Sequence, residues 1–197
     1  MADIQELDRR AVRTSVALVR QVTPDRLDLP TPCAEWDLRA LLAHLTVQHV
    51  GFARAVAGER TELADWRPSP LADDFAAAYD RAADLVIESF GAPGATERRA
   101  YLPEIRNGVT VPGGMAMGFH FIDYVVHSWD VAAAIGAPVE FDDDVLAAAL
   151  RVAGQVPTDP ASRGPGTAFD PVLPEPAGAT PLARVLALLG RSPTWPE

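Results

Sequence analysis

Apolar residues recur with the spacing of an α-helix in four long stretches of this sequence. Pro- or Gly-rich breaks separate these stretches, which cover residues 3–22, 37–57, 71–90 and 115–135. Asp37 favours the start of the second helix, whereas Gly58 and Gly136 favour the ends of the second and the fourth. Four helices of about 20 residues each predict an all-α fold, a four-helix bundle.

Shorter elements are expected outside these helices. Between the third and fourth helices, Asn107-Gly108 is a hairpin-turn signal and β-prone residues follow it, so a small hairpin or an irregular excursion is expected. This long third connection predicts a departure from a simple up-down bundle. Residues 142–156 and 182–190 predict short extra C-terminal helices. Because no internal repeat is present, residues 1–197 are expected to form one domain.

The composition argues against several classes of function. All 17 basic residues are arginine, which excludes chemistry that needs a lysine, such as Schiff-base catalysis or a P-loop. The net charge of −10, without an Arg-rich run, argues against a nucleic-acid partner. No run of about 18 apolar residues exists, so no membrane partner is expected. With a single cysteine, Cys33, and no apolar signal region at the N-terminus, a cytoplasmic protein is expected.

An acid and an imidazole interrupt the apolar fourth helix. Asp123 and His127 are four residues apart, so they project from one helix face, and His120 shares that face. On the second helix, His44 lies in the apolar segment "LLAHL", whereas His49 points about 140° away and is expected outside the same site. Bundle metal sites are built from such inward-pointing acids and histidines on facing helices. His44, Asp123 and His127 are therefore the candidate metal ligands.

The donor types indicate which metals would suit the site. Two nitrogens and one oxygen suit a divalent transition metal, with zinc as first choice and nickel or iron as alternatives. Three protein ligands leave a position open, as in catalytic sites. A simpler interpretation is that these polar residues satisfy one another by hydrogen bonds in the core.

Two further polar residues of the fourth helix have open roles. His120 could be a fourth ligand, an outer partner of the site or a residue facing solvent near the helix start, and the last two are favoured. Asp130 could accept a hydrogen bond from a ligating imidazole, or it could tie the helix to a neighbouring helix or arginine.

The segments that carry these residues resemble a known family. "LPTPCAEWDLRALLAHL" (29–45) and "DYVVHSWDVAAAIG" (123–136) are similar to the metal-binding domain of mycothiol-dependent maleylpyruvate isomerases, in the DinB-like superfamily. The C-terminal "LARVLALLGRSPTW" resembles the end of stand-alone actinobacterial members. The resemblance implies a DinB-like bundle with a divalent metal on His44, Asp123 and His127. The isomerases have glutamate at the position of Asp123, so here the metal would lie nearer the helix, or the ligation would be weaker or water-bridged.

The resemblance also implies an activity. A small thiol, mycothiol in this family, would be ionised by the metal and delivered to an electrophilic substrate, as in a thiol S-transferase or isomerase. Because the isomerases have a further C-terminal domain, maleylpyruvate isomerisation itself is not assigned. The alternative is a metal-binding sensor or interaction module without catalysis. The apolar surface that a short bundle leaves exposed also allows a homodimer.

Other residues near these segments have simpler interpretations. Cys33 precedes the second helix, where a thiol can become acidic, but a small buried residue in a tight turn is preferred. Trp36 and Trp129 are expected in the core or in the wall of the site. Arg54 and Arg106 could meet an anionic substrate, although solvated side chains are the safer expectation.

Overall fold

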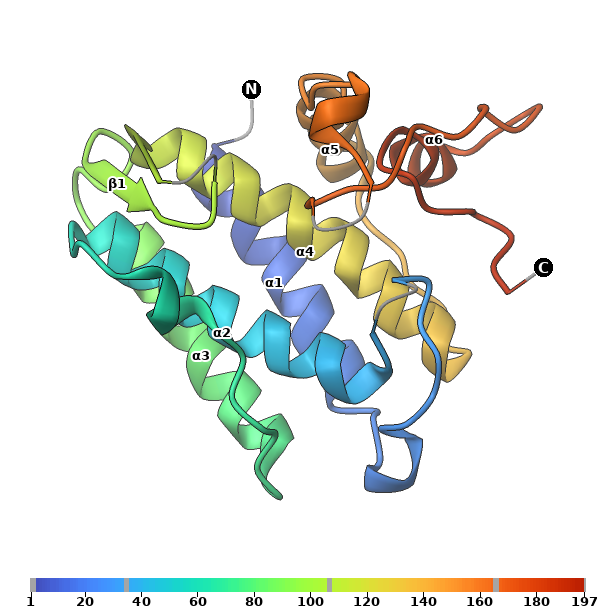
Figure 1. The fold of residues 1–197 in the computed structure, drawn as a ribbon, viewed down its shortest axis with the longest axis horizontal. Coiled ribbons are helices and arrows are strands. Elements are labelled where there is room, and N and C mark those ends of the chain that lie inside the picture. Colours follow the sequence, from blue (N-terminus) through green and yellow to red (C-terminus); the bar gives the residue numbers. More distant parts are fainter. Residues whose placement is uncertain (1–2, 34–35, 106–107, 165–166, 197) are drawn as a thin grey trace.

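Helices dominate the computed structural model, which describes residues 3–33, 36–105, 108–164 and 167–196 (Figure 1). The four long helices are α1 (Ile4–Val19), α2 (Leu38–Ala57), α3 (Phe75–Gly91) and α4 (Gly113–Ile135). They pack into the four-helix bundle expected from the sequence, so the all-α prediction is confirmed. Within the described part of the chain, no helix combines the length and the apolar character needed to cross a membrane.

The ends of α2 and α4, the two helices with the candidate ligands, agree with their capping signals. The Asp37 carboxylate accepts a hydrogen bond of 2.8 Å from the backbone N–H of Ala40. Gly58 and Gly136 follow α2 and α4 with φ angles of 94° and 66°, in the left-handed region that favours glycine. Only α3 differs clearly from expectation, since it begins at Phe75 rather than near residue 71.

The direction of the helices differs from a simple up-down bundle. Ser89, near the end of α3, donates to the carbonyl of Ala53, near the end of α2. These two consecutive helices therefore run parallel (Figure 1). By contrast, Gln5 at the start of α1 donates to the carbonyl of Phe90 at the end of α3, so α1 and α3 are antiparallel. The prediction placed the departure in the third connection, and this was wrong, because the chain returns along the bundle in the second connection instead.

A buried tryptophan holds this second connection, residues 58–74, against the bundle. The connection contains a short 3-10 helix, η2 (Leu63–Trp66), and the indole N–H of Trp66 donates to the hydroxyl of Thr61 at 2.8 Å. The Trp66 ring lies so close to Gly51 of α2 that a Cβ added there would come within 2.7 Å of it. The absence of a side chain at Gly51 therefore makes room for the returning chain.

Two smaller units flank the bundle. The expected hairpin is present, with β1 (Arg99–Leu102) antiparallel to β2 (Val109–Pro112), although Asn107 of its predicted turn lies outside the described residues. The predicted C-terminal helices are α5 (Asp143–Ala153) and α6 (Pro181–Leu188). Helix α5 packs on α4 and α1, and α6 packs on α5. The C-terminal segment thus lies beside the face of the bundle formed by α1 and α4.

Candidate metal centre

Three side chains from two antiparallel helices converge on one point. His44 lies on α2, and Asp123 and His127 lie one turn apart on α4. The Nε2 atom of His127 is 3.3 Å from Oδ1 of Asp123, and the Nε2 atom of His44 is 3.9 Å from Oδ2 of the same carboxylate. One donor atom from each residue lies within 4.8 Å of the other two. The structure therefore brings together the three residues selected from the sequence.

One of the two donor contacts has the spacing of ligands on a tetrahedral divalent ion. Zinc holds nitrogen and oxygen ligands at about 2.0–2.2 Å, which places two ligands of a tetrahedron about 3.3–3.6 Å apart. The 3.3 Å contact of His127 lies in this range, whereas the 3.9 Å contact of His44 is longer and is to the other oxygen of the carboxylate. Asp123 thus lies close to both histidines, through a different oxygen for each. The Asp123 and His44 side chains are 22% and 18% exposed, so the cluster also has an opening to solvent.

The charges in the cluster are strongly coupled. Burial lowers the pKa of His44 to about 4. Burial opposes ionisation of Asp123, but the neighbouring His127 and His44 outweigh it and lower the pKa of that carboxyl to about 2. Burial likewise opposes the charge on His127, yet Asp123 and Asp130 raise its pKa to about 9. The raised pKa of His127 and the lowered pKa of Asp123 favour an imidazolium beside a carboxylate when no metal is bound.

Asp130 holds the far side of the His127 ring. Its Oδ2 atom lies 2.8 Å from Nδ1 of His127, which leaves Nε2 directed at Asp123. Nε of Arg191, which follows α6, donates to both oxygens of Asp130 at 3.2 and 3.4 Å. Asp130 therefore makes both of the contacts considered for it, one with an imidazole and one with an arginine, while ligation of a metal by that imidazole stays a prediction. Sequence reasoning missed Arg191, since no local pattern links it to a residue 61 positions away.

Trp36, in the segment before α2, lies beside the two histidines, and the loop between β1 and β2 carries a further acid, Glu104. The ring of Trp36 lies 4.5 Å from the ring of His44 and 6.1 Å from that of His127, centroid to centroid, in agreement with a wall residue. Gln48 donates to the carboxylate of Glu104 at 2.7 Å. Burial raises the pKa of Glu104, and the charge of Asp123 raises it further, which indicates a second acid on this side of the bundle that the sequence did not single out.

Cys33 does not have the character of a reactive thiol. It is half-buried, and its carbonyl accepts a turn hydrogen bond of 2.8 Å from the N–H of Trp36. Burial raises the pKa of the thiol to about 11, with Arg191 opposing. The turn-residue interpretation therefore fits better than an acidic thiol.

His120 belongs to a separate, fully buried cluster. Its Nδ1 atom lies 2.6 Å from Oδ1 of Asp8, and its Nε2 atom lies 3.1 Å from Nδ1 of His49. The ring of His49 also stacks on that of Tyr124, with 4.1 Å between centroids. Of the two favoured roles for His120, the solvent-facing one is wrong, because the side chain is buried and its hydrogen bonds are with Asp8 and His49. The expectation that His49 lies outside the metal cluster is confirmed.

The two arginines considered for an anionic substrate do not enter the centre. Arg54 is half-buried and forms an ion pair with Glu59, at 2.8 Å, so the solvated interpretation fits better than a place in the centre. Arg106 lies outside the described residues.

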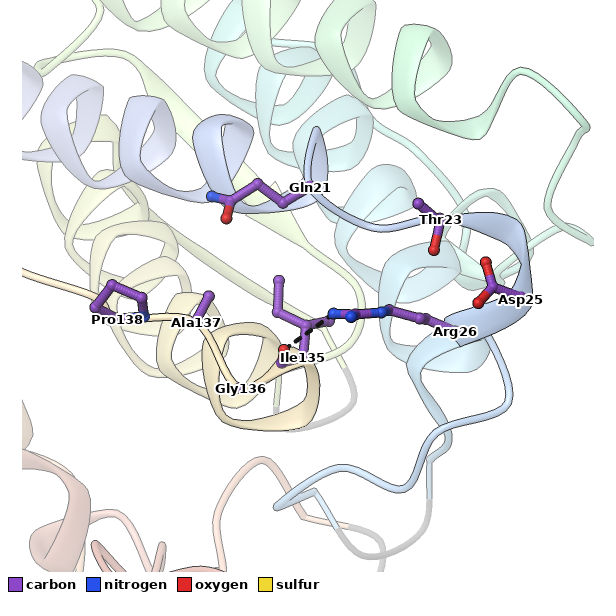
Figure 2. Close-up of a pocket in the computed structure, with 8 residues that line it drawn as sticks. All are labelled: Gln21, Thr23, Asp25, Arg26, Ile135, Gly136, Ala137 and Pro138. Carbon is purple, nitrogen blue, oxygen red and sulfur yellow. Dashed lines mark hydrogen bonds between the residues drawn. The ribbon is translucent and has the colours of Figure 1, made fainter.

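Figure 2 shows a hollow at the C-terminal end of α4, and none of the three candidate ligands lines it. Arg26 crosses it and donates from Nη1 to the carbonyl of Ile135 at 3.1 Å. This hydrogen bond satisfies a carbonyl in the last turn of α4. The contact across the hollow thus has a structural role at the end of α4, the helix that carries two of the candidate ligands.

Comparisons with known proteins identify the family and support the fold. Residues 9–132 match the family described as the mycothiol maleylpyruvate isomerase N-terminal domain. Uncharacterised proteins from two strains of Mycobacterium tuberculosis are each 32% identical over 189 residues, covering 93% of this chain and 95% of theirs. The crystal structure of the mycothiol-dependent maleylpyruvate isomerase shares the fold, with a TM-score of 0.60 and 14% identity over 90% of this chain and 77% of that one. A histidine-to-alanine mutant of that enzyme gives a TM-score of 0.61 at the same identity and coverage. The chain therefore belongs to the mycothiol maleylpyruvate isomerase N-terminal domain family.

Proposed function

We propose that the protein binds a divalent metal ion, with zinc as first choice, through His44, Asp123 and His127, and that it is a metal-dependent thiol S-transferase or isomerase. The convergence of three donor atoms within 4.8 Å carries this proposal. Membership of the family supports mycothiol as the thiol. The second substrate would be a small electrophile.

The residues around the cluster suit this chemistry. A coordinated thiol loses its proton at neutral pH because the charge of the ion stabilises the thiolate. Three protein ligands leave a position for it, and the partial exposure of His44 and Asp123 provides access. Trp36 lies against the histidine rings on one side of the cluster. The protein needs no nucleophile of its own, in agreement with the high pKa of the Cys33 thiol.

Metal analysis and a conjugation assay test the proposal together. The protein is purified without a nickel column, and its zinc content and its rate of mycothiol conjugation to chlorodinitrobenzene are measured before and after EDTA treatment. We expect about one ion per chain, conjugation that is lost on metal removal, and recovery with zinc. A rate that is unchanged by metal removal contradicts the mechanism. Metal binding without conjugation to this or other electrophiles favours the sensor or interaction module.

Metal binding at pH 7 is expected to release about one proton per ion. His127, whose pKa is raised to about 9, must lose its proton, whereas His44 with a pKa of about 4 is already neutral and Asp123 with a pKa of about 2 is already ionised. The apparent affinity should therefore rise about tenfold per pH unit between roughly pH 5 and 9. Isothermal titration calorimetry in buffers of different ionisation enthalpy measures the number of protons. A value near zero at pH 7 would show that His127 is not the titrating ligand.

A further inference from the structure

We propose that Arg191, in the C-terminal segment, is a positioning residue for the metal centre and acts through Asp130 on His127. The inference rests on the proposed function for its effect on metal binding, although the contacts themselves do not depend on it. Arg191 lies outside residues 9–132, the part of the chain that matches the family.

A continuous buried chain of contacts links the C-terminal segment to the candidate ligand. Nε of Arg191 lies 3.2 and 3.4 Å from the two oxygens of Asp130, and Oδ2 of Asp130 lies 2.8 Å from Nδ1 of His127. The Arg191 and Asp130 side chains are 3% and 0% exposed, so water cannot replace either of these contacts easily. Nη1 of Arg191 also lies 3.6 Å from the Asp170 carboxylate, which faces the guanidinium from the opposite loop.

The backbone around Arg191 directs its side chain toward α4. Helix α6 ends in a Schellman turn, in which the N–H of Arg191 bonds to the carbonyl of Leu186 at 2.9 Å and Gly190 has a φ of 78°. A Cβ at Gly190 would come within 2.7 Å of the Asp170 backbone, so this close approach requires glycine. The position of Arg191 is therefore built into the turn and the loop packed against it.

Charge balance explains why an arginine is needed at this point. Asp130 is completely buried, and a buried carboxylate without a cation is strongly unfavourable. His127 can serve as a metal ligand only as a neutral imidazole, and it then offers Asp130 a hydrogen bond but no positive charge. When His127 is neutral, Arg191 is the cation that remains in direct contact with Asp130. By holding both oxygens, it also fixes the direction in which Asp130 accepts from Nδ1 and hence the direction of Nε2.

Arg163 provides a matched control for this proposal. It is a second buried arginine of the C-terminal segment, but it donates to backbone carbonyls, among them those of Pro157, Asp170 and Leu188 at 2.7–3.1 Å. Its side chain therefore anchors the same segment without contacting Asp130. An effect of loosening this segment should appear in both arginine variants, whereas an effect of positioning should appear only at Arg191.

The test compares the cobalt and zinc affinities of Arg191→Met, Arg191→Lys and Arg163→Met with those of the wild-type full-length chain. We expect Arg191→Met to weaken binding about tenfold, the low end for losing an outer partner of a ligand, and to change the visible spectrum of bound Co²⁺. Arg191→Lys should recover part of the affinity, and Arg163→Met should keep both affinity and spectrum even if it melts at a lower temperature. In a protein that already carries Asp130→Asn, adding Arg191→Met should cause no further loss of metal affinity.

A measurement on the metal-free protein separates this inference from the proposed function. The Hδ1 proton of His127, observed by NMR, should be protected from exchange in the wild type and in Arg163→Met but not in Arg191→Met. If the wild type binds no metal, the proposed function fails, and this measurement still decides whether Arg191 positions the ring. Equal losses of metal affinity in Arg191→Met and Arg163→Met, or unchanged Hδ1 protection in Arg191→Met, overturn the inference.

Discussion

Replacing His127 by alanine is expected to reduce zinc affinity by more than about 100-fold, beyond the usual cost of losing an outer partner of a ligand. The variant loses the donor that lies 3.3 Å from Asp123 and leaves only His44 and the carboxylate. Two donors cannot define the site that three hold within 4.8 Å. Competition with a zinc-chelating dye at pH 7 measures the change.

His49→Ala is the control for this prediction. It also removes a buried imidazole, here from α2. That imidazole belongs to the cluster that contains Asp8 and His120 rather than to the candidate metal site. We expect it to lower the stability while leaving the zinc affinity within a fewfold of the wild-type value. Wild-type affinity in a folded His127→Ala variant, checked by circular dichroism, would show that these three residues do not form the binding site.

The second large effect is expected from His120→Leu, which should lower the free energy of unfolding by about 3–5 kcal/mol. His120 is the partner of Asp8 in the bundle core, at 2.6 Å, and both side chains are buried. Burial raises the pKa of Asp8, and the charge and hydrogen bond of His120 oppose that rise. Without His120, the carboxyl group stays in the core with no partner. Urea unfolding at pH 7 in the presence of EDTA measures the loss without any contribution from a metal.

Removing both members of the pair tests the cause of this loss. In Asp8→Leu combined with His120→Leu, no carboxyl group remains buried, so most of the stability should return. The loss in His120→Leu alone should also shrink as the pH falls, because the pKa of Asp8 is raised in the folded state and protonation removes the buried charge. A double variant as unstable as His120→Leu would mean that packing, rather than the acid–imidazole contact, causes the loss.

The candidate ligands could be selected from the sequence because they follow local rules. Asp123 and His127 are one helical turn apart, and the ends of their helix and of α2 are marked by glycines and by Asp37. These signals depend only on neighbouring residues, and the structure agrees with them closely. Whether the three residues bind a metal stays a prediction that the experiments above address.

The partners of the site could not be predicted, because they depend on which helices meet. Asp8 and His120 are separated by 112 positions and Asp130 and Arg191 by 61, so no periodicity connects them. The partner of His120 is set by α1 packing on α4, which in turn depends on the return of the chain between α2 and α3. We predicted the departure from an up-down bundle in the third connection rather than the second, because the sequence of residues 58–74 gives no sign that Trp66 packs beside Gly51.

The two polar clusters also restrict how α2 and α4 can slide along each other. A shift of one helical turn moves one helix by about 5.4 Å relative to the other. Such a shift would part His49 from His120, now 3.1 Å apart, and would leave their nitrogens in the core without partners. The buried cluster of Asp8, His49 and His120 therefore opposes a change in the register of α2 against α4. It therefore also keeps His44 of α2 level with Asp123 of α4.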